Sequence, residues 1–234
     1  MKNIKGILFD FNGTLFFDSK IHLSVFRDIS RELLGREFTE EFMIKSIFGR
    51  TNAKIYRDNF KADATDEECR RFNSMKLSRY FDTCLATPSL LRLVDGVADM
   101  LDYLKAQKIP YCISTGSDRE EMEFFIRHLG LERWFSWDNI VYTDGSFNGK
   151  PAPDCYQLAA RRIGLNPDEC VVFEDAGSGI LAARAAGAGA LVVIHESTVP
   201  SPLDGSYDVL GEYTDLRGWR DILSDLGLFQ SERK

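Results

Sequence analysis

Three acidic residues of this sequence are placed so that their carboxylates could bind a metal ion. Glu174 and Asp175 are adjacent, and Asp10 ends a short apolar run near the start of the chain. A pair of acids before a helix is commonly a cap. Beside Asp10, however, the pair would repel it unless a divalent cation joined them, and Mg²⁺ prefers such oxygen ligands. The acids therefore suggest a metal site if the fold brings them together.

Two further segments could bind an anion. Residues 114–117, Ser-Thr-Gly-Ser, end another apolar run, so that hydroxyl and backbone N–H groups can converge on a negative charge. Lys150 is followed by Pro151, and Pro153 lies two residues further. Prolines restrict the backbone, so they would help to hold the positive charge of Lys150 in one place. Taken alone, such hydroxyls are more often helix caps and such a lysine is more often a solvated surface residue.

The elements that would position these residues form an alternating pattern. Short apolar runs, typical of strands buried on both faces of a parallel sheet, occupy residues 4–9, 109–114, 170–173 and 190–194. Helical patterns occupy residues 97–107, 119–128, 156–163 and 180–186. Strands alternating with helices predict an α/β fold with a doubly wound parallel sheet, and a ligand site at the carboxyl edge of that sheet.

One long segment does not follow this alternation. Residues 17–87 carry helical periodicity without a convincing strand, with expected helices at 21–34, 40–47, 54–60 and 66–81. We therefore expect a Rossmann-like catalytic core made of residues 1–16 and 88–234, and a helical cap domain made of residues 17–87, inserted after the first strand.

Composition limits the class of partner. The chain has 234 residues, a net charge of -7 and no long Lys/Arg run, which disfavours nucleic acid and anionic membranes as partners. It has no apolar run of 18 residues and five widely spaced cysteines, an odd number with no CxxC pair. We expect a cytoplasmic protein with reduced cysteines that is a monomer or a weak dimer.

Together, the four segments resemble the motifs of the haloacid dehalogenase-like superfamily, in the subfamily with a helical cap after the first motif, which includes phosphoglycolate phosphatases and β-phosphoglucomutases. The first motif, DxDGT, is similar to residues 10–14, Asp-Phe-Asn-Gly-Thr. Thr115 corresponds to the second motif, and residues 150–154 contain the complete third motif, KPxPD. Glu174 and Asp175, followed by a glycine-containing loop, correspond to the fourth. The order of the motifs and the helical insert agree over essentially the whole chain.

The resemblance implies covalent catalysis. Asp10 would attack phosphorus and form an aspartyl-phosphate that water then hydrolyses. Thr115 and the N–H of Gly116 would bind phosphate oxygens, and Lys150 would supply fixed positive charge between Asp10 and the phosphate. The resemblance also implies a Mg²⁺ cofactor.

The metal ligands implied by the resemblance come from the first and fourth motifs. Asp10, the backbone carbonyl of Asn12 and Asp175 would hold Mg²⁺, with Glu174 contributing through water. The ion would offset the repulsion between a carboxylate nucleophile and a phosphate dianion.

Asn12 is the one departure from the motifs. Phosphatases of the family carry an aspartate here, which protonates the leaving oxygen and later deprotonates the attacking water, and an amide can do neither. Dehalogenases, ion pumps and phosphonate hydrolases carry other residues at this position. The acid pair disfavours a metal-independent dehalogenase, and the lack of a membrane segment disfavours a pump. A phosphonate hydrolase would need an amine in the cap, for which the candidates are Lys45, Lys54, Lys61 and Lys76.

These observations leave two classes of function open. The first is a Mg²⁺-dependent phosphoric monoester hydrolase acting on a small phosphorylated metabolite of the sugar phosphate or phosphoglycolate type, slowed by Asn12. The second is a regulatory protein that binds a phosphorylated ligand with weak or lost catalysis. A β-phosphoglucomutase-like phosphotransferase is a further alternative, although such an enzyme uses the missing aspartate. Arg50, in a Gly-Arg pair between two cap helices, is a candidate substrate contact or a structural ion pair.

Overall fold

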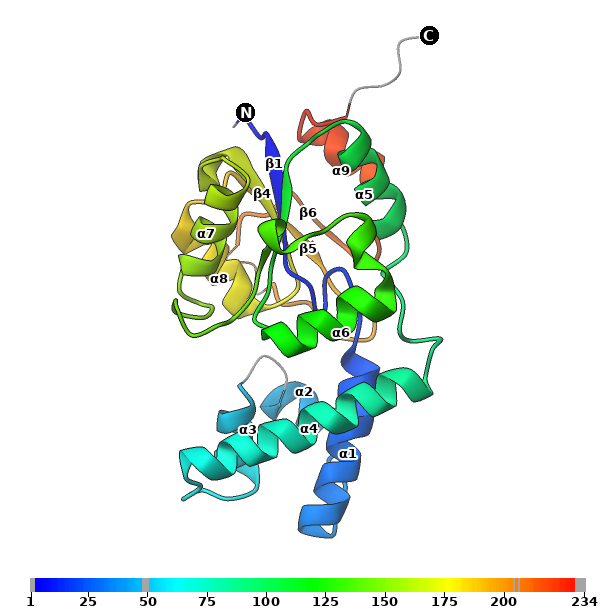
Figure 1. Ribbon diagram of the computed structural model, residues 1–234, viewed down its shortest axis with the longest axis vertical. Coiled ribbons are helices and arrows are strands. Elements are labelled where there is room, and N and C mark those ends of the chain that lie inside the picture. Colours follow the sequence, from blue (N-terminus) through cyan, green and yellow to red (C-terminus); the bar gives the residue numbers. More distant parts are fainter. Residues whose placement is uncertain (1–2, 48–50, 204, 206, 230–234) are drawn as a thin grey trace. The chain divides into compact units, whose positions relative to one another are not determined.

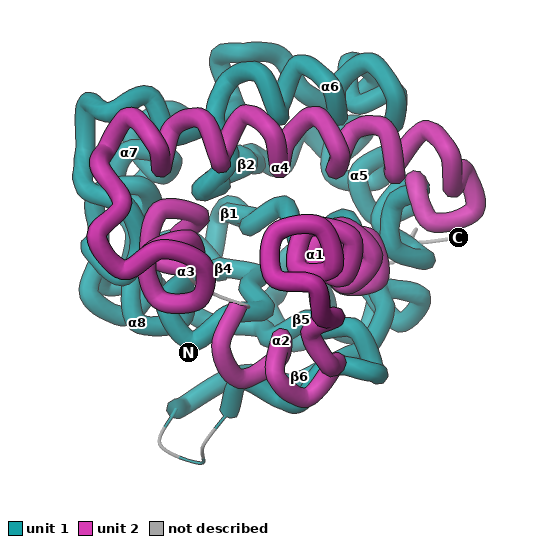
Figure 2. Tube along the Cα trace, turned by 90° about the horizontal axis from the view of Figure 1, so that it is seen from below, with its two compact units in different colours: residues 1–17, 92–234 teal, residues 18–91 magenta. Residues whose placement is uncertain are grey.

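A computed structural model describes residues 3–47, 51–203, 205 and 207–229. The chain divides into two compact units, which Figure 2 colours separately. Unit 1 contains residues 1–17 and 92–234, and unit 2 contains residues 18–91.

Unit 1 is built on a parallel sheet with the strand order β3-β2-β1-β4-β5-β6. The strands are β1 (Gly6–Phe9), β2 (Tyr111–Ser114), β3 (Ile140–Val141), β4 (Cys170–Glu174), β5 (Ala190–Ile194) and β6 (Gly211–Tyr213). Its α-helices are α5 (Val97–Ala106), α6 (Arg119–Leu129), α7 (Asp154–Arg162), α8 (Gly177–Ala186) and α9 (Trp219–Asp225). Short 3-10 turns span Leu131–Arg133, Trp137–Asn139 and Pro167–Glu169. In Figure 1, α7 and α8 cover one face of the sheet, and α5 and α9 cover the other.

The strand register sets the position of the chemically interesting residues. Phe9 of β1 lies beside Ile113 of β2 on one side and beside Phe173 of β4 on the other. The next residue on each strand is polar: Asp10, Ser114 and Glu174. Because the three strands are parallel and adjacent, these residues lie at the same carboxyl edge, where ligands bind in doubly wound sheets.

The predicted fold class is confirmed, and the sheet is wider than the four strands that the sequence indicates. The additional strands are β3 and β6, both at the edges of the sheet. β3 has only two residues, and β6 has the sequence Gly-Glu-Tyr and is only partly buried. β3 is apolar but very short, and β6 is not an apolar run, so hydrophobic periodicity does not reveal them. The helix α9 was also not predicted from the sequence.

Unit 2 is helical, and no strand occurs among its described residues. It consists of α1 (Ser19–Leu34), α2 (Glu40–Ser46), α3 (Asn52–Asn59) and α4 (Asp66–Ala86). Threonines 39, 51 and 65 cap the last three helices by accepting backbone N–H groups. After α4, the carbonyl of Thr87 accepts hydrogen bonds from the N–H groups of Leu90 and Leu91. Leu90 and Leu91 belong to unit 2, which ends at Leu91.

Among the described residues, no helix is both long enough and apolar enough to cross a membrane.

Candidate active site

The segment after β1 is a tight turn that begins with Asp10. The Asp10 N–H donates a hydrogen bond of 2.9 Å to the carbonyl of Phe173 on β4, which fixes the start of the turn. The carbonyl of Phe11 accepts from Leu15 and Phe16, and the Gly13 N–H donates to the Phe16 carbonyl over 2.7 Å. The chain thus changes direction immediately after β1. The backbone hydrogen bonds of this turn hold Asp10 and Asn12 in place.

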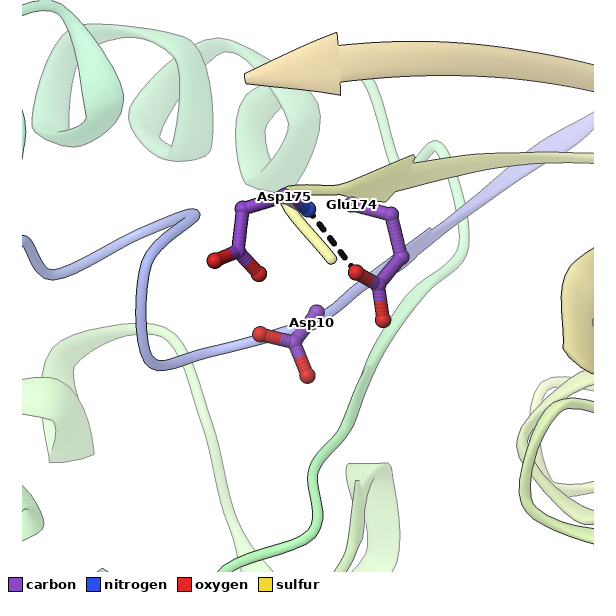
Figure 3. A group of neighbouring side chains, drawn as sticks. All are labelled: Asp10, Glu174 and Asp175. Carbon is purple, nitrogen blue, oxygen red and sulfur yellow. Dashed lines mark hydrogen bonds between the residues drawn. The ribbon is translucent and has the colours of Figure 1, made fainter. Parts of the chain in front are cut away.

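Asp10, Glu174 and Asp175 form a cluster at this edge of the sheet (Figure 3), where they offer carboxylate oxygens that all lie within 4.8 Å of one another. Asp10 is 7% exposed and Glu174 1% exposed, whereas Asp175 is partly exposed. Like charges held this closely with little access to water need a compensating cation. The structure brings together all three acids that the sequence singles out.

Lys150 supplies part of that compensation. Its Nζ lies 2.5 Å from Oδ1 of Asp10 and 2.5 Å from Oε1 of Glu174, and 4.9 Å from the centre of the Tyr156 ring. Burial alone would lower the pKa of Lys150, but the attraction of Asp10 and Glu174 outweighs it and holds the pKa well above its ordinary value. Lys150 is therefore a fixed positive charge in contact with Asp10.

Glu174 is held by four donors. Besides Lys150, Oε1 accepts a hydrogen bond of 2.9 Å from the Tyr156 hydroxyl, and Oε2 accepts from the N–H groups of Asp175 and Ala176, each at 2.8 Å. Gly179 leaves room for this carboxylate, since a Cβ there would lie 1.6 Å from Oε1. Glu174 is thus arranged to orient Lys150 and the turn that carries Asp175.

Tyr156 is a site residue that the sequence did not indicate. It lies in α7, is fully buried and points its hydroxyl at Glu174. Burial, followed by the charge of Glu174, raises the pKa of Tyr156 well above its usual value, so it is a neutral hydrogen-bond donor. In the sequence, Tyr156 has the pattern of a core aromatic in an amphipathic helix, which gives no signal of a polar role.

The segment after β2 supplies the hydroxyl groups. Thr115 is buried, and its N–H donates to the carbonyl of Val141 over 2.9 Å, while Gly116 is exposed. The N–H of Ser117 donates to Oγ1 of Thr115 at 3.1 Å, and the Ser117 hydroxyl donates to Oδ1 of Asn12 at 2.9 Å. The β1 and β2 turns are therefore joined directly through Ser117, a contact that the sequence did not indicate.

The residues present fit a divalent cation. Asp10 and Asp175 offer hard oxygen donors close together, and Gly13 makes room for Asp175, because a Cβ on Gly13 would lie 2.0 Å from its Oδ2. Since donors of the protein itself already engage both Glu174 oxygens, this residue suits an indirect role. Arg50, the candidate substrate contact or structural ion pair, lies outside the described residues.

Among the four cap lysines considered for amine chemistry, burial separates one. Lys45, Lys54 and Lys61 are exposed, whereas Lys76, which lies on α4 of unit 2, is 4% exposed. Its Nζ lies 4.7 Å from the centre of the Tyr80 ring. The hydroxyl of Tyr80 in turn donates to Oδ2 of Asp18 at 2.6 Å.

A parallel α/β core with an acid cluster, a partly buried lysine and hydroxyl groups at the carboxyl edge defines a hydrolase of the haloacid dehalogenase type. The chain belongs to the haloacid dehalogenase-like hydrolases, whose family model matches residues 4–187. This confirms the family that the motifs suggested.

Individual relatives agree with this assignment. The chain is 32% identical over 188 residues to a fructose-1-phosphate phosphatase of Escherichia coli, covering 80% of this chain and 95% of that protein. It is 29% identical over 236 residues to a probable pseudouridine-5'-phosphatase of Saccharomyces cerevisiae, covering 95% and 93%. A crystal structure of a family IA hydrolase of this class from Entamoeba histolytica has a TM-score of 0.76 at 35% identity, covering 82% of this chain and 84% of that one. The prediction of a hydrolytic enzyme of the phosphoric monoester hydrolase class is confirmed at the level of family and reaction class.

Proposed function

We propose that this protein hydrolyses a phosphate monoester of a small metabolite, with Asp10 as the nucleophile. The observation that carries the proposal is the contact of Asp10 with Lys150 inside a cluster of three carboxylates. A carboxylate held by a partly buried cation is poorly suited to act as a base. It is well suited to a nucleophile that must attack an anionic phosphate at a fixed angle.

Each residue of the site has a separate role in the proposed reaction. A carboxylate oxygen of Asp10 forms a bond to phosphorus while the bond from phosphorus to the ester oxygen breaks, and water later hydrolyses the aspartyl-phosphate. Lys150 and the hydroxyl of Thr115, with the exposed backbone of Gly116, bind the phosphoryl oxygens and stabilise the charge that builds on them. Glu174 and Tyr156 keep Lys150 in place.

A Mg²⁺ ion held by Asp10, Asp175 and the backbone carbonyl of Asn12, with Glu174 acting indirectly, would reduce the repulsion between the nucleophile and the phosphate. The fit of the acid cluster supports this ion, because hard carboxylate oxygens are the ligands that Mg²⁺ prefers.

The substrate that we propose is a phosphorylated small metabolite, with sugar phosphates as the first class to test. The names of two relatives, a fructose-1-phosphate phosphatase and a probable pseudouridine-5'-phosphatase, support a phosphorylated substrate that carries a sugar group. A purely binding function remains the second candidate, because Asn12 places an amide where the family's phosphatases carry their proton-transferring aspartate.

The two functions are separated by assaying phosphate release from a panel of sugar phosphates, nucleoside monophosphates, phosphoglycolate and p-nitrophenyl phosphate with Mg²⁺. We expect hydrolysis of at least one ester, loss of that activity in excess chelator, and its return with added Mg²⁺. The Asp10→Asn variant is the control for contaminating phosphatases. Binding of the panel members without release from any of them would favour the binding protein, and full activity in excess chelator would exclude the metal.

A further inference from the structure

The orientation of the Asn12 side chain is set by a residue far away in the sequence. The Ser117 hydroxyl donates a hydrogen bond of 2.9 Å to Oδ1 of Asn12, and 105 residues separate the two. The Ser117 residue is 8% exposed. An amide oxygen engaged in this way leaves the Nδ2–H₂ group on the opposite side of the carboxamide from Ser117.

Both partners stand on hydrogen-bonded backbone, which limits where the two side chains can meet. The Ser117 N–H donates to Oγ1 of Thr115, and the Ser117 carbonyl accepts from the N–H of Thr143 at 2.9 Å. Asn12 forms a bridge with Phe16 across the turn that follows β1. A shift of either main chain would break such contacts, so the Ser117 hydroxyl and the Asn12 carboxamide meet at a defined place.

Asn12 is two residues from the proposed nucleophile, on the same turn. An amide cannot give up a proton to a leaving group, but its N–H can donate a hydrogen bond to an oxygen on which negative charge develops. Which end of the carboxamide faces the substrate then matters, because the carbonyl end would repel that same charge.

We propose that Ser117 is a positioning residue for the proposed phosphatase reaction: it turns the N–H of Asn12 toward the leaving oxygen, which departs as a hydrogen-bonded anion. Asp10 forms its bond to phosphorus, the bond from phosphorus to the ester oxygen breaks, and the electron pair stays on that oxygen. Asn12 keeps its protons. The departing alkoxide or phenolate takes its proton from water.

This arrangement predicts how the rate responds to the leaving group. The more basic the leaving oxygen, the more charge it carries in the transition state and the more it gains from the N–H. A net hydrogen bond contributes about 0.5–1.5 kcal/mol, so losing the Ser117 hydroxyl should slow an alkyl ester roughly 2- to 12-fold. An ester of p-nitrophenol, whose leaving group is stable as an anion, should slow less than about twofold on the same argument.

The test measures the single-turnover rate of leaving-group release, with saturating Mg²⁺, for a series of substituted phenyl phosphates and one alkyl phosphate. The proteins are the wild type, Ser117→Ala, Ser117→Thr, Asn12→Ala and the double variant Ser117→Ala with Asn12→Ala. Ser224→Ala, at an exposed serine on α9, controls for loss of a serine elsewhere in unit 1. Thermal melting checks that each variant is folded, and Ser117→Cys, which keeps the shape and weakens the donor, replaces the alanine variant if that one does not fold.

We expect Ser117→Ala to make the rate depend more steeply on leaving-group basicity, and Ser117→Thr to keep the wild-type dependence. In the Asn12→Ala background, Ser117→Ala should have no effect on the rate. An equal loss for every leaving group, or a loss that persists in the Asn12→Ala background, would overturn the positioning role while leaving the phosphatase function intact. A wild-type protein that releases no leaving group from any ester would instead refute the proposed function, and the positioning role with it.

Discussion

The carboxylate of Asp175 fills the space that a side chain on Gly13 would need: a Cβ on Gly13 would lie 2.0 Å from Oδ2 and 2.4 Å from the carboxyl carbon of Asp175. Gly13 also has a φ of 84°, a conformation that residues with a Cβ adopt at a cost. The turn after β1 and the loop that carries Asp175 therefore pack closely against each other, and they can do so because Gly13 has no side chain. Position 13 thus requires glycine for two reasons, the positive φ of the turn and the close approach of Asp175.

Replacing Gly13 with alanine should weaken Mg²⁺ binding as well as stability, because the new methyl group displaces a proposed ligand. The backbone strain costs about 1–2 kcal/mol. Gly130→Ala is the matched control, since Gly130 has a φ of 65° and nothing within 4 Å of the position of a Cβ. Calorimetric titration with Mg²⁺ and thermal unfolding separate the two effects. Equal Mg²⁺ affinity of the two variants would contradict a role of Asp175 in binding the ion.

Replacing Asp10 with asparagine should abolish turnover and preserve the fold. The change keeps the shape of the side chain and removes its nucleophilic charge, and Lys150 retains Glu174 as a partner. Phosphate release and circular dichroism measure the two outcomes. Normal hydrolysis by pure Asp10→Asn protein would refute the covalent scheme.

Restoring an aspartate at position 12 should raise turnover on alkyl phosphates by roughly one to four powers of ten, because general acid–base groups contribute about 10²–10⁴-fold. Aryl phosphates with good leaving groups should gain less. The comparison requires mass spectrometry of the peptide that contains Asn12, since an Asn-Gly sequence deamidates and would produce the same aspartate. Equal rates on an alkyl phosphate for intact wild type and Asn12→Asp would show that another residue supplies the proton.

The cysteines of the folded protein should resist alkylation. Burial raises the pKa of Cys84, Cys112 and Cys170 to about 12, so only about one part in 10⁴ of each thiol is ionised at pH 8. Because the unfolded thiols ionise near pH 8.5, these groups favour the folded state below that pH, and this contribution declines as the pH rises above it. Iodoacetamide at pH 8 with mass spectrometry should modify these thiols in urea and not in buffer. Rapid labelling of Cys112 in buffer would contradict its burial in the sheet.

The central part of the fold was predictable from sequence because its signal is local. β1, β2, β4 and β5 are apolar runs, and the residues that follow the first, second and third of them carry hydroxyl or carboxyl groups. Parallel strands with a common carboxyl edge then bring Asp10, Thr115 and Glu174 to one place without further information. The edge strands β3 and β6 lack this signal, since they are short and are recognised only by their pairing with a neighbour.

The contacts within the site were less predictable than the motifs. Tyr156 reaches Glu174 from a helix, and Ser117 reaches Asn12 from another turn. Each contact depends on side-chain directions set by packing over long sequence separations, and neither residue type is unusual at its position. The sequence singles out Asn12 as a departure, but it cannot say which end of the amide faces the site. The structure adds that Oδ1 of Asn12 accepts a hydrogen bond from the Ser117 hydroxyl.

The strand order also has a consequence for synthesis on the ribosome. β1 precedes the other strands of this sheet in the chain, yet it lies between β2 and β4 and pairs through Gly6 with Cys170. A nascent chain that has not yet produced β4 exposes one side of an apolar strand, an edge that is prone to pairing with other chains. We therefore expect chaperone dependence during translation to be greatest until β4 emerges, and premature stops between β2 and β4 to yield aggregated products.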